Sequence, residues 1–313
     1  MHHFLQDVLK GLQSSPKYLD SKYFYDKKGD ALFQKIMASG EYYLTNSEKE
    51  IFSKQTAQIA ETVLNGTNDL DVIEFGSGDA TKSIHLLKEL AERKAIHTYF
   101  PIDISENIIL LLNKTLSKKL PHVTIHGLHG EYLEMLSETK KLSAKRKLIL
   151  LLGANIGNFK FNEMPVFCKK LRSLLDDGDM VLIGFDLKKN PAKILAAYND
   201  KGGLTKRFNL NLLKRINKEL HANFKLKNFG HYATYDPADG ACKSYLVSMK
   251  QQEVSICKKT VIPFEKNECI FMEISQKYDQ SQVTKIALEC GFEPVGNFFD
   301  KKKYFVDVIW KCA

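Results

Sequence analysis

Residues 71–79 read DVIEFGSGD, and this short stretch decides the fold that we expect. Its first part, residues 71–75, is mostly apolar and predicts a short strand buried within a sheet. Gly76 and Gly78 follow directly, and residues 80–93 continue at helical spacing. Glycines allow a sharp turn from strand to helix and a close approach of the backbone to a ligand, while the helix N-terminus attracts negative charge. The stretch therefore predicts a strand, loop and helix that together bind a ligand at the carboxyl end of the strand.

The number of glycines in this loop distinguishes between classes of nucleotide ligand. Dinucleotide-binding loops place three glycines around a pyrophosphate, whereas the loop GSGDAT at residues 76–81 lacks the third. This difference favours a ligand without pyrophosphate, and S-adenosylmethionine is such a ligand. Asp103 closes the next predicted strand, where its carboxylate can accept hydrogen bonds from two ribose hydroxyls. Glu131 and Tyr132 follow the third strand, where they can meet the edge and the face of an adenine ring.

Predicted strands and helices alternate up to about residue 189. Strands are expected over residues 71–75, 98–103, 123–128, 147–152 and 180–185, and helices over residues 31–38, 51–64, 80–93, 107–119 and 165–175. Ser47 with Glu50 fits a capping box, which predicts that a helix begins at Ser47. The alternation is typical of a parallel sheet covered by helices on both faces. The alternative is a doubly wound protein in which the glycines serve only to make tight turns.

Pro191 opens a stretch that breaks this rhythm. Helices are expected there over residues 192–198 and 209–220, antiparallel strands over 241–250, 253–259 and 268–275, and afterwards a helix over 281–289 and a hairpin of 292–298 with 303–310. A last helix followed by a hairpin is how the sheet of class I methyltransferases ends. We therefore predict an α/β domain with a Rossmann-like sheet and a terminal antiparallel hairpin, formed by residues 47–189 and 279–313. A smaller α+β lobe, formed by residues 1–46 and 190–278, would bind the substrate.

The composition of the 313-residue chain narrows the classes of partner. Its formal net charge is +9, from 46 Lys and Arg against 37 Asp and Glu. The basic residues form short clusters without an Arg-rich stripe or interleaved aromatics, so we expect a solvated lysine-rich surface and no nucleic-acid partner. The six cysteines form no CxxC pair and are not grouped with histidines, so we expect no metal site.

The sequence carries no targeting or membrane signal. No apolar segment of signal-peptide type follows Met1, and no apolar run reaches the length of a membrane-spanning helix. We expect a cytoplasmic monomer with reduced cysteines that acts on a small molecule and does not bind a membrane.

Several motifs together resemble one family, the histidine Nα-methyltransferases of ergothioneine biosynthesis. They are YFYD at residues 23–26, EYY at 41–43 with Thr45 and Glu48, EFGSG at 74–78 with Lys82, GANIGNF at 153–159, GFDLKK at 184–189, AYND at 197–200, Thr205 with Phe208 and Asn209, and EIS at 273–275 with Lys277. The resemblance covers nearly the whole chain. It implies an enzyme that transfers a methyl group from S-adenosylmethionine to the α-amino nitrogen of L-histidine, with successive methylation to the trimethylated betaine as in the family.

The resemblance also implies a role for individual residues. The cofactor would be bound by Gly76, Gly78, Lys82, Asp103, Glu131, Tyr132 and Gly153. The amino acid would be bound by Tyr42, Asn158, Tyr198, Ser244, Glu273 and Ser275, and the catalytic residues would be Tyr25 and Asn158. Methyl transfer needs a neutral amine aligned with the methyl group, and phenols and an amide can orient it without a buried countercharge. A carboxylate facing the ring N–H would reject substrates that leave it unpaired.

Other interpretations of these residues remain open. Tyr25 and Tyr42 belong to an aromatic cluster that could be simple core, and Asn158 could cap a helix. Glu273 and a nearby serine could face only water. Ser244 stands where the family has methionine, and Gly130-Glu131-Tyr132 replaces its usual Gly-Asp-Phe. The substrate could therefore be another aromatic amino acid, a histidine derivative or another small amine. Because the net charge is positive, a protein or nucleic-acid methyltransferase is a further alternative. The last alternative is a protein that binds S-adenosylmethionine without catalysing a reaction.

Overall fold

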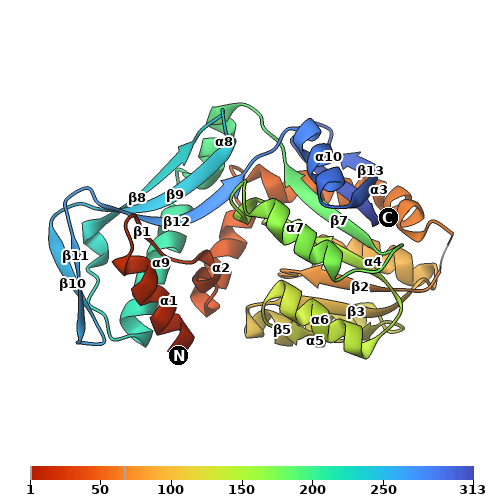
Figure 1. The fold of residues 1–313 in the computed structure, drawn as a ribbon, viewed down its shortest axis with the longest axis horizontal. Helices are drawn as coiled ribbons and strands as arrows, with labels where there is room; N and C mark the ends of the chain where they lie inside the picture. Colours follow the sequence, from red (N-terminus) through yellow and green to blue (C-terminus); the bar gives the residue numbers. More distant parts are fainter. Residues whose placement is uncertain (1, 67) are drawn as a thin grey trace. The chain divides into compact units, whose positions relative to one another are not determined.

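The computed structural model describes residues 2–66 and 68–313, which form two compact units (Figure 1). Unit 1 comprises the residues up to Tyr43 together with Lys189–Ser275. Unit 2 comprises Leu44–Lys188 and Gln276–Ala313. The boundaries predicted from the sequence were residues 1–46 with 190–278 for the smaller lobe, and 47–189 with 279–313 for the sheet domain. Met1 and Thr67, which fall within the predicted segments, lie outside the described residues.

Unit 2 is built on one eight-stranded sheet. Its strands are β2 (Leu70–Phe75), β3 (Ile96–Asp103), β4 (Thr124–Ile125), β5 (Leu128–His129), β6 (Arg146–Leu151), β7 (Met180–Asp186), β13 (Phe292–Phe299) and β14 (Phe305–Cys312). They follow the order β13-β14-β7-β6-β2-β3-β4, with β5 also paired to β3. The strands from β7 to β4 are parallel, whereas β14 is antiparallel to both β7 and β13. This order confirms the predicted class I methyltransferase sheet with its terminal hairpin.

The direction of the chain reverses between β2 and β6. From β2 the chain continues to β3 on one side, and it later returns to β6 on the other side. In open parallel sheets a ligand binds at the carboxyl ends of the strands beside such a reversal. The loops after β2, β3 and β6 therefore form the expected binding edge of unit 2.

Helices flank this sheet, and one face packs into a continuous apolar core. The helices are α3 (Tyr43–Leu64), α4 (Ser83–Glu92), α5 (Glu106–Lys119), α6 (Tyr132–Leu142), α7 (Met164–Ser173) and α10 (Gln280–Glu289), with a short 3-10 helix η2 (Asn155–Asn158). Residues of α6, α7 and α10 pack against alternate residues of the strands, such as Ile73, Phe75, Val306 and Val308. Residues between these, such as Glu74, point to the opposite face because side chains alternate along a strand.

Several predicted boundaries in unit 2 were wrong. The helix expected to begin at Ser47 begins at Tyr43, so Ser47 lies buried inside its first turns. Helix α4 begins at Ser83, because Ala80 has a left-handed φ of 54° that no helix can contain. The expected third strand is split into β4 and β5, and α6 was not predicted. Leu136 is the only large apolar residue of α6 that is fully buried, so its helical periodicity is weak.

Unit 1 contains a four-stranded sheet and a separate hairpin. Its elements are α1 (His2–Gln13), β1 (Lys17–Tyr18), η1 (Ser21–Phe24), α2 (Lys27–Met37), α8 (Pro191–Tyr198), α9 (Leu204–Glu219), η3 (Leu226–Asn228), β8 (Phe229–Tyr235), β9 (Ala241–Ser248), β10 (Gln252–Ile256), β11 (Thr260–Phe264) and β12 (Cys269–Gln276, whose last residue belongs to unit 2). The sheet has the order β1-β12-β9-β8, and β10 pairs with β11. Because β1 pairs with β12, the N-terminal segment and the 190–278 segment share one sheet.

Among residues 2–66 and 68–313, none of the helices has the length and the apolar character needed to cross a bilayer.

Candidate functional site

The loop after β2 is shaped by Gly76. Its φ of 66° is left-handed, and its amide donates a hydrogen bond of 2.8 Å to the carbonyl of Ile102 on β3. A Cβ at this position would lie 2.7 Å from both Asn155 Nδ2 and the Tyr132 hydroxyl. Both the conformation and the space therefore require glycine, as the sequence predicted.

Gly78 and Asp103, which were predicted as cofactor residues, are brought together. Asp103 ends β3, and its carboxylate accepts hydrogen bonds from the amides of Gly78 at 3.2 Å and Ser105 at 2.9 Å. Burial raises the pKa of Asp103, although these backbone amides oppose the rise. The carboxylate is thus fixed in orientation and keeps further lone pairs for hydroxyl donors. Apart from its two chain neighbours, no described residue has an atom within 4 Å of the Cβ position of Gly78, so a ligand can approach the backbone there.

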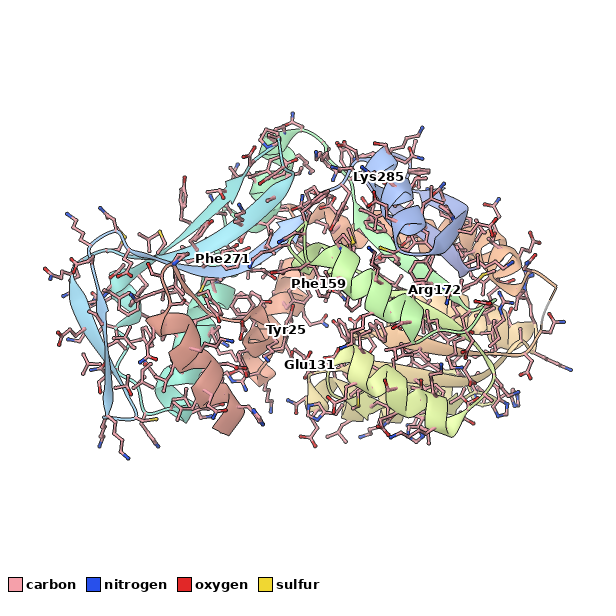
Figure 2. The ribbon with its side chains drawn as sticks, in the orientation of Figure 1. Tyr25, Glu131, Phe159, Arg172, Phe271 and Lys285 are labelled. Atoms are coloured by element: carbon pink, nitrogen blue, oxygen red, sulfur yellow. The ribbon has the colours of Figure 1, made fainter. Side chains whose placement is uncertain are left out.

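Tyr132 is the first residue of α6. Glu131 directly precedes it (Figure 2). The ring of Tyr132 stacks on Phe75 with centroids 5.0 Å apart and an interplanar angle of 2°. Its hydroxyl reaches the loop at Gly76, and burial raises its pKa. Glu131 precedes the helix with an exposed side chain. The structure therefore places Tyr132 at the glycine loop and Glu131 on the adjoining surface.

Lys82 and Gly153 meet at a residue that the predicted site did not include, Glu48 of α3. The Glu48 carboxylate accepts a hydrogen bond of 2.7 Å from the Gly153 amide and forms an ion pair with Lys82. Gly153 has a φ of 73°, and a Cβ there would lie 3.1 Å from Lys82 Nζ. The predicted cofactor residue Lys82 thus already has a protein partner. Glu48 stood among the residues that carried the resemblance, but no sequence pattern indicated its role.

An asparagine to which the sequence assigned no role, Asn155, faces the glycine loop, close in sequence to the predicted substrate residue Asn158. Both belong to η2, which follows β6. Asn158 has an exposed side chain at the end of this element, whereas the Asn155 amide lies beside the Cβ position of Gly76. The sequence placed both in one motif and could not tell which faces the loop.

Tyr198 and Ser275 of unit 1 form a buried polar pair. The Tyr198 hydroxyl and Ser275 Oγ are 2.7 Å apart, and either can donate. Tyr42 packs edge-on against Tyr198 with ring centroids 6.1 Å apart. These three predicted substrate residues therefore gather in one place, although they come from separate parts of the sequence.

Tyr25 joins this group through other aromatic rings. Its ring lies 5.7 Å from Phe33 and 5.8 Å from Phe208, and Phe33 lies 6.3 Å from Tyr42. Tyr25 is half-buried, as is Glu273 on β12. Ser244 is buried on β9, where it pairs with Ala233 of β8.

Asn209 is a polar residue of unit 1 to which the sequence assigned no role. It is fully buried on α9, and its Nδ2 donates a hydrogen bond of 3.0 Å to the carbonyl of Thr205. Its Oδ1 accepts no hydrogen bond from the described part of the chain. Buried polar atoms are rarely left without a partner, so this oxygen is a candidate to meet a ligand or water.

Two other motif residues serve the fold of unit 2. Lys277 Nζ lies 2.8 Å from the Asp186 carboxylate, and both side chains are fully buried. This pair ties the end of β7 to the segment that follows β12.

Together, the strand order and the glycine loop define a class I methyltransferase. A family model described as histidine-specific, S-adenosylmethionine-dependent methyltransferase matches residues 4–312. The chain therefore belongs to this family of enzymes.

Individual relatives are similar over most of their length. The chain is 32% identical over 274 residues to the histidine N-alpha-methyltransferase of Mycobacterium tuberculosis, covering 87% of this chain and 84% of that protein. It is 29% identical over 301 residues to the enzyme of the same name from Mycolicibacterium smegmatis, covering 94% and 92%. The 4-dimethylallyltryptophan N-methyltransferase of Claviceps fusiformis is 32% identical over 204 residues, covering 62% of this chain and 57% of that protein.

The residues at the binding edge of unit 2 suit the cofactor of this family. Asp103 offers an oriented carboxylate for hydroxyl groups, and the loop at Gly78 is open to a ligand. In the described parts of the chain, no group of three or more His, Cys, Asp or Glu side chains could hold a metal ion.

Proposed function

We propose that this enzyme transfers the methyl group of S-adenosylmethionine to the α-amino nitrogen of L-histidine. The observation that supports this most strongly is the joining of Gly76, Gly78 and Asp103 at one edge of the sheet, in a chain that matches the family from residue 4 to residue 312. Bound S-adenosylmethionine supplies an electrophilic methyl group on its sulfonium.

The cofactor-binding residues that we propose lie in unit 2. They are Gly76, Gly78, Lys82, Asp103, Glu131, Tyr132 and Gly153. Asp103 would bind the ribose hydroxyls, and Tyr132 would pack beside the adenine. The loop glycines let the cofactor lie against the backbone. Asn155 joins this set because its amide faces the same loop.

The amino acid would be held mainly by unit 1. We propose Tyr42, Tyr198, Ser244, Glu273 and Ser275 as binding residues, with Tyr25 and Asn158 at the reacting amine. The hydrogen-bonded pair of Tyr198 and Ser275 supports this, because its hydroxyls are buried and fixed in position. Glu273 would accept a hydrogen bond from the imidazole N–H.

The reaction needs a deprotonated amine whose lone pair is aligned with the methyl group. Tyr25 and Asn158 carry neutral groups that can orient this nitrogen without holding it as an ammonium ion. For successive methylation the site would also have to accept a head group that grows and becomes a permanent cation.

The test is incubation of the purified enzyme with S-adenosylmethionine and free histidine, followed by mass spectrometry. We expect histidine that carries one to three added methyl groups, and S-adenosylhomocysteine as the second product. Formation of neither product with histidine would refute the proposal. The same assay is run with a panel of other amino acids. If one of them is methylated and histidine is not, that amino acid is the substrate.

A second candidate substrate is a larger aromatic amino acid. Ser244 stands where the family has methionine, and a smaller residue leaves more room in a pocket. The relative from Claviceps fusiformis bears the name of a tryptophan-derivative methyltransferase. If Ser244 shapes the pocket, Ser244→Met will raise kcat/KM for histidine relative to tryptophan by about 3- to 10-fold. An unchanged ratio would remove Ser244 from the pocket. Ser248→Ala, on the same face of β9, is the matched control.

We further propose a cytoplasmic monomer. The six free cysteines support a reducing compartment. Size-exclusion chromatography with light scattering checks the oligomeric state, and a mass of two chains would contradict a monomer.

A further inference from the structure

We propose that Glu48 is a positioning residue for the cofactor site, which holds the Lys82 ammonium with one carboxylate oxygen and the Gly153 amide with the other. Asp307 in turn holds Glu48 through a shared proton. The inference rests on the proposed cofactor role of Lys82 and Gly153.

The two contacts of Glu48 use different oxygens. Oε1 accepts the hydrogen bond of 2.7 Å from the Gly153 amide, and Oε2 receives the ammonium of Lys82. The side chain of Glu48 is 1% exposed, whereas that of Lys82 is 19% exposed. The carboxylate is therefore the buried anchor, and the Lys82 side chain stays partly exposed. One side chain thus fixes two groups from loops that follow different strands.

The sheet leaves space for this carboxylate. A Cβ on Gly184 of β7 would lie 2.5 Å from Glu48 Oε1, so only glycine fits there. In the sheet Gly184 pairs with Asp307 of β14. Both residues lie between neighbours that point into the apolar core, so they face the opposite side of the sheet, where Glu48 enters. The glycine thus makes room for Glu48 beside a second carboxyl group.

The charges of the cluster explain how it tolerates burial. Four acidic or basic groups meet there, namely Glu48 of α3, Glu74 of β2, Lys82 just before α4 and Asp307 of β14. Burial and the Glu48 charge raise the pKa of Asp307 well above its usual range. Burial also raises the pKa of Glu74 to about 7, against the hydrogen bond from Tyr99 that lowers it. Asp307 is therefore neutral and can donate its proton to Glu48, which leaves Glu48 and Lys82 as a balanced pair.

The carboxyl group of Asp307 is buried, and both of its oxygens lack a hydrogen-bond donor among the described residues. No N–H or O–H group of residues 2–66 and 68–313 donates to either of its carboxyl oxygens. An ionised Asp307 would then be a buried charge without compensation, which is strongly unfavourable. A protonated Asp307 beside Glu48 resolves this, because two adjacent carboxyls share one proton.

The direct test measures the affinity for S-adenosylhomocysteine by calorimetry in the absence of any amino acid. We expect Glu48→Gln to weaken binding by about 10- to 100-fold, since the neutral amide loses a charged hydrogen bond and the ion pair. Lys82→Met should weaken binding to a similar extent, and the double variant should be no weaker than the poorer single one. Additive losses, or wild-type affinity of Glu48→Gln, would overturn the proposal.

A matched control lies on the same helix. Glu50 forms an ion pair of 2.6 Å with Lys54 in an exposed position, so Glu50→Gln makes the same chemical change away from the site. We expect it to leave the affinity unchanged, and an equal loss in Glu50→Gln and Glu48→Gln would mean that the effect is not specific.

Asp307 provides a second pair of variants in case Glu48→Gln does not fold. Asp307→Asn keeps a neutral donor toward Glu48, whereas Asp307→Leu removes it. We expect Asp307→Asn to bind S-adenosylhomocysteine at least 5-fold more tightly than Asp307→Leu. Equal affinities of the two variants, or tighter binding by Asp307→Leu, would show that Glu48 needs no hydrogen-bond donor at position 307. These measurements involve no histidine, so their outcome is independent of the histidine assay. A failure here contradicts the role of Glu48, whereas a failure of the histidine assay contradicts the proposed substrate.

Discussion

The candidate residues of unit 2 differ in kind from those of unit 1. In unit 2 the cofactor loop depends on main-chain geometry, with Gly76, Gly78 and Gly153 all at left-handed φ and the loop amide of Gly78 bonded to Asp103. In unit 1 the candidate residues are side chains, such as Tyr198 bonded to Ser275 across 77 positions of sequence. A site made by the backbone is sensitive to any added side chain, whereas a site made by side chains is sensitive to the loss of single polar atoms.

The largest effect that follows from this comparison is expected at Gly76. Gly76→Ala adds a Cβ that meets Asn155 and Tyr132 at 2.7 Å, in a backbone conformation that alanine rarely adopts. We expect binding of S-adenosylhomocysteine to weaken by at least about 100-fold, measured by calorimetry. Gly40→Ala is the control, because among residues 2–66 and 68–313, its two chain neighbours aside, no atom lies within 4 Å of its Cβ position. Equal binding by Gly76→Ala and wild type would contradict the main-chain character of this site.

A smaller, more selective effect is expected in unit 1. Tyr198→Phe removes the hydroxyl that is 2.7 Å from Ser275 Oγ and leaves the ring in place. We expect kcat/KM for the amino acid to fall by about 10-fold, because a buried hydrogen bond is lost. KM for S-adenosylmethionine should stay within 2-fold of wild type in steady-state kinetics. Ser275→Ala should reproduce the result. If only KM for S-adenosylmethionine rose, the result would contradict the proposed role of Tyr198 in binding the amino acid.

A further effect concerns stability instead of binding, and it compares the buried charges of unit 2 with the neutral hydroxyls of unit 1. The pKa of Glu74 is raised by burial to about 7 from an ordinary value of 4.5. The folded state thus binds this proton more tightly than the unfolded chain, so the stabilising contribution is complete below about pH 4.5 and is lost as pH rises to about 7. The shift corresponds to about 3 kcal/mol at most.

Urea unfolding of wild type and Glu74→Gln at pH 5 and pH 8 measures this contribution. We expect the free energy of unfolding of the wild type to fall more between the two pH values than that of Glu74→Gln. Parallel changes in the two proteins would show that Glu74 does not titrate in this range. Ser275→Ala, which removes no ionisable group, should follow the wild type.

Local patterns were enough to predict much of unit 2. The parallel strands are short apolar runs, and the glycines between strand and helix mark where the chain must turn, so β2, β3, β6 and β7 were found close to their observed bounds. Helix α6 was missed because few of its residues are buried. In unit 1, β8 and β11 were missed, since the first contains glycine and histidine and the second a proline. Such residues interrupt a strand pattern unless the neighbouring strand is known.

From the sequence, the motifs that resemble the family indicated the family and its type of sheet, and the spacing of strand, glycines and helix indicated where the cofactor loop lies, because such patterns are local properties of the chain. Only the tertiary structure showed that Asn155 faces the loop, that Asp307 adjoins Glu48, and that Glu48 reaches Gly153 across 105 positions. Contacts of this kind form when distant elements pack on the same face of a sheet. No local pattern encodes them, since they depend on which elements become neighbours and on the space that a residue such as Gly184 leaves open.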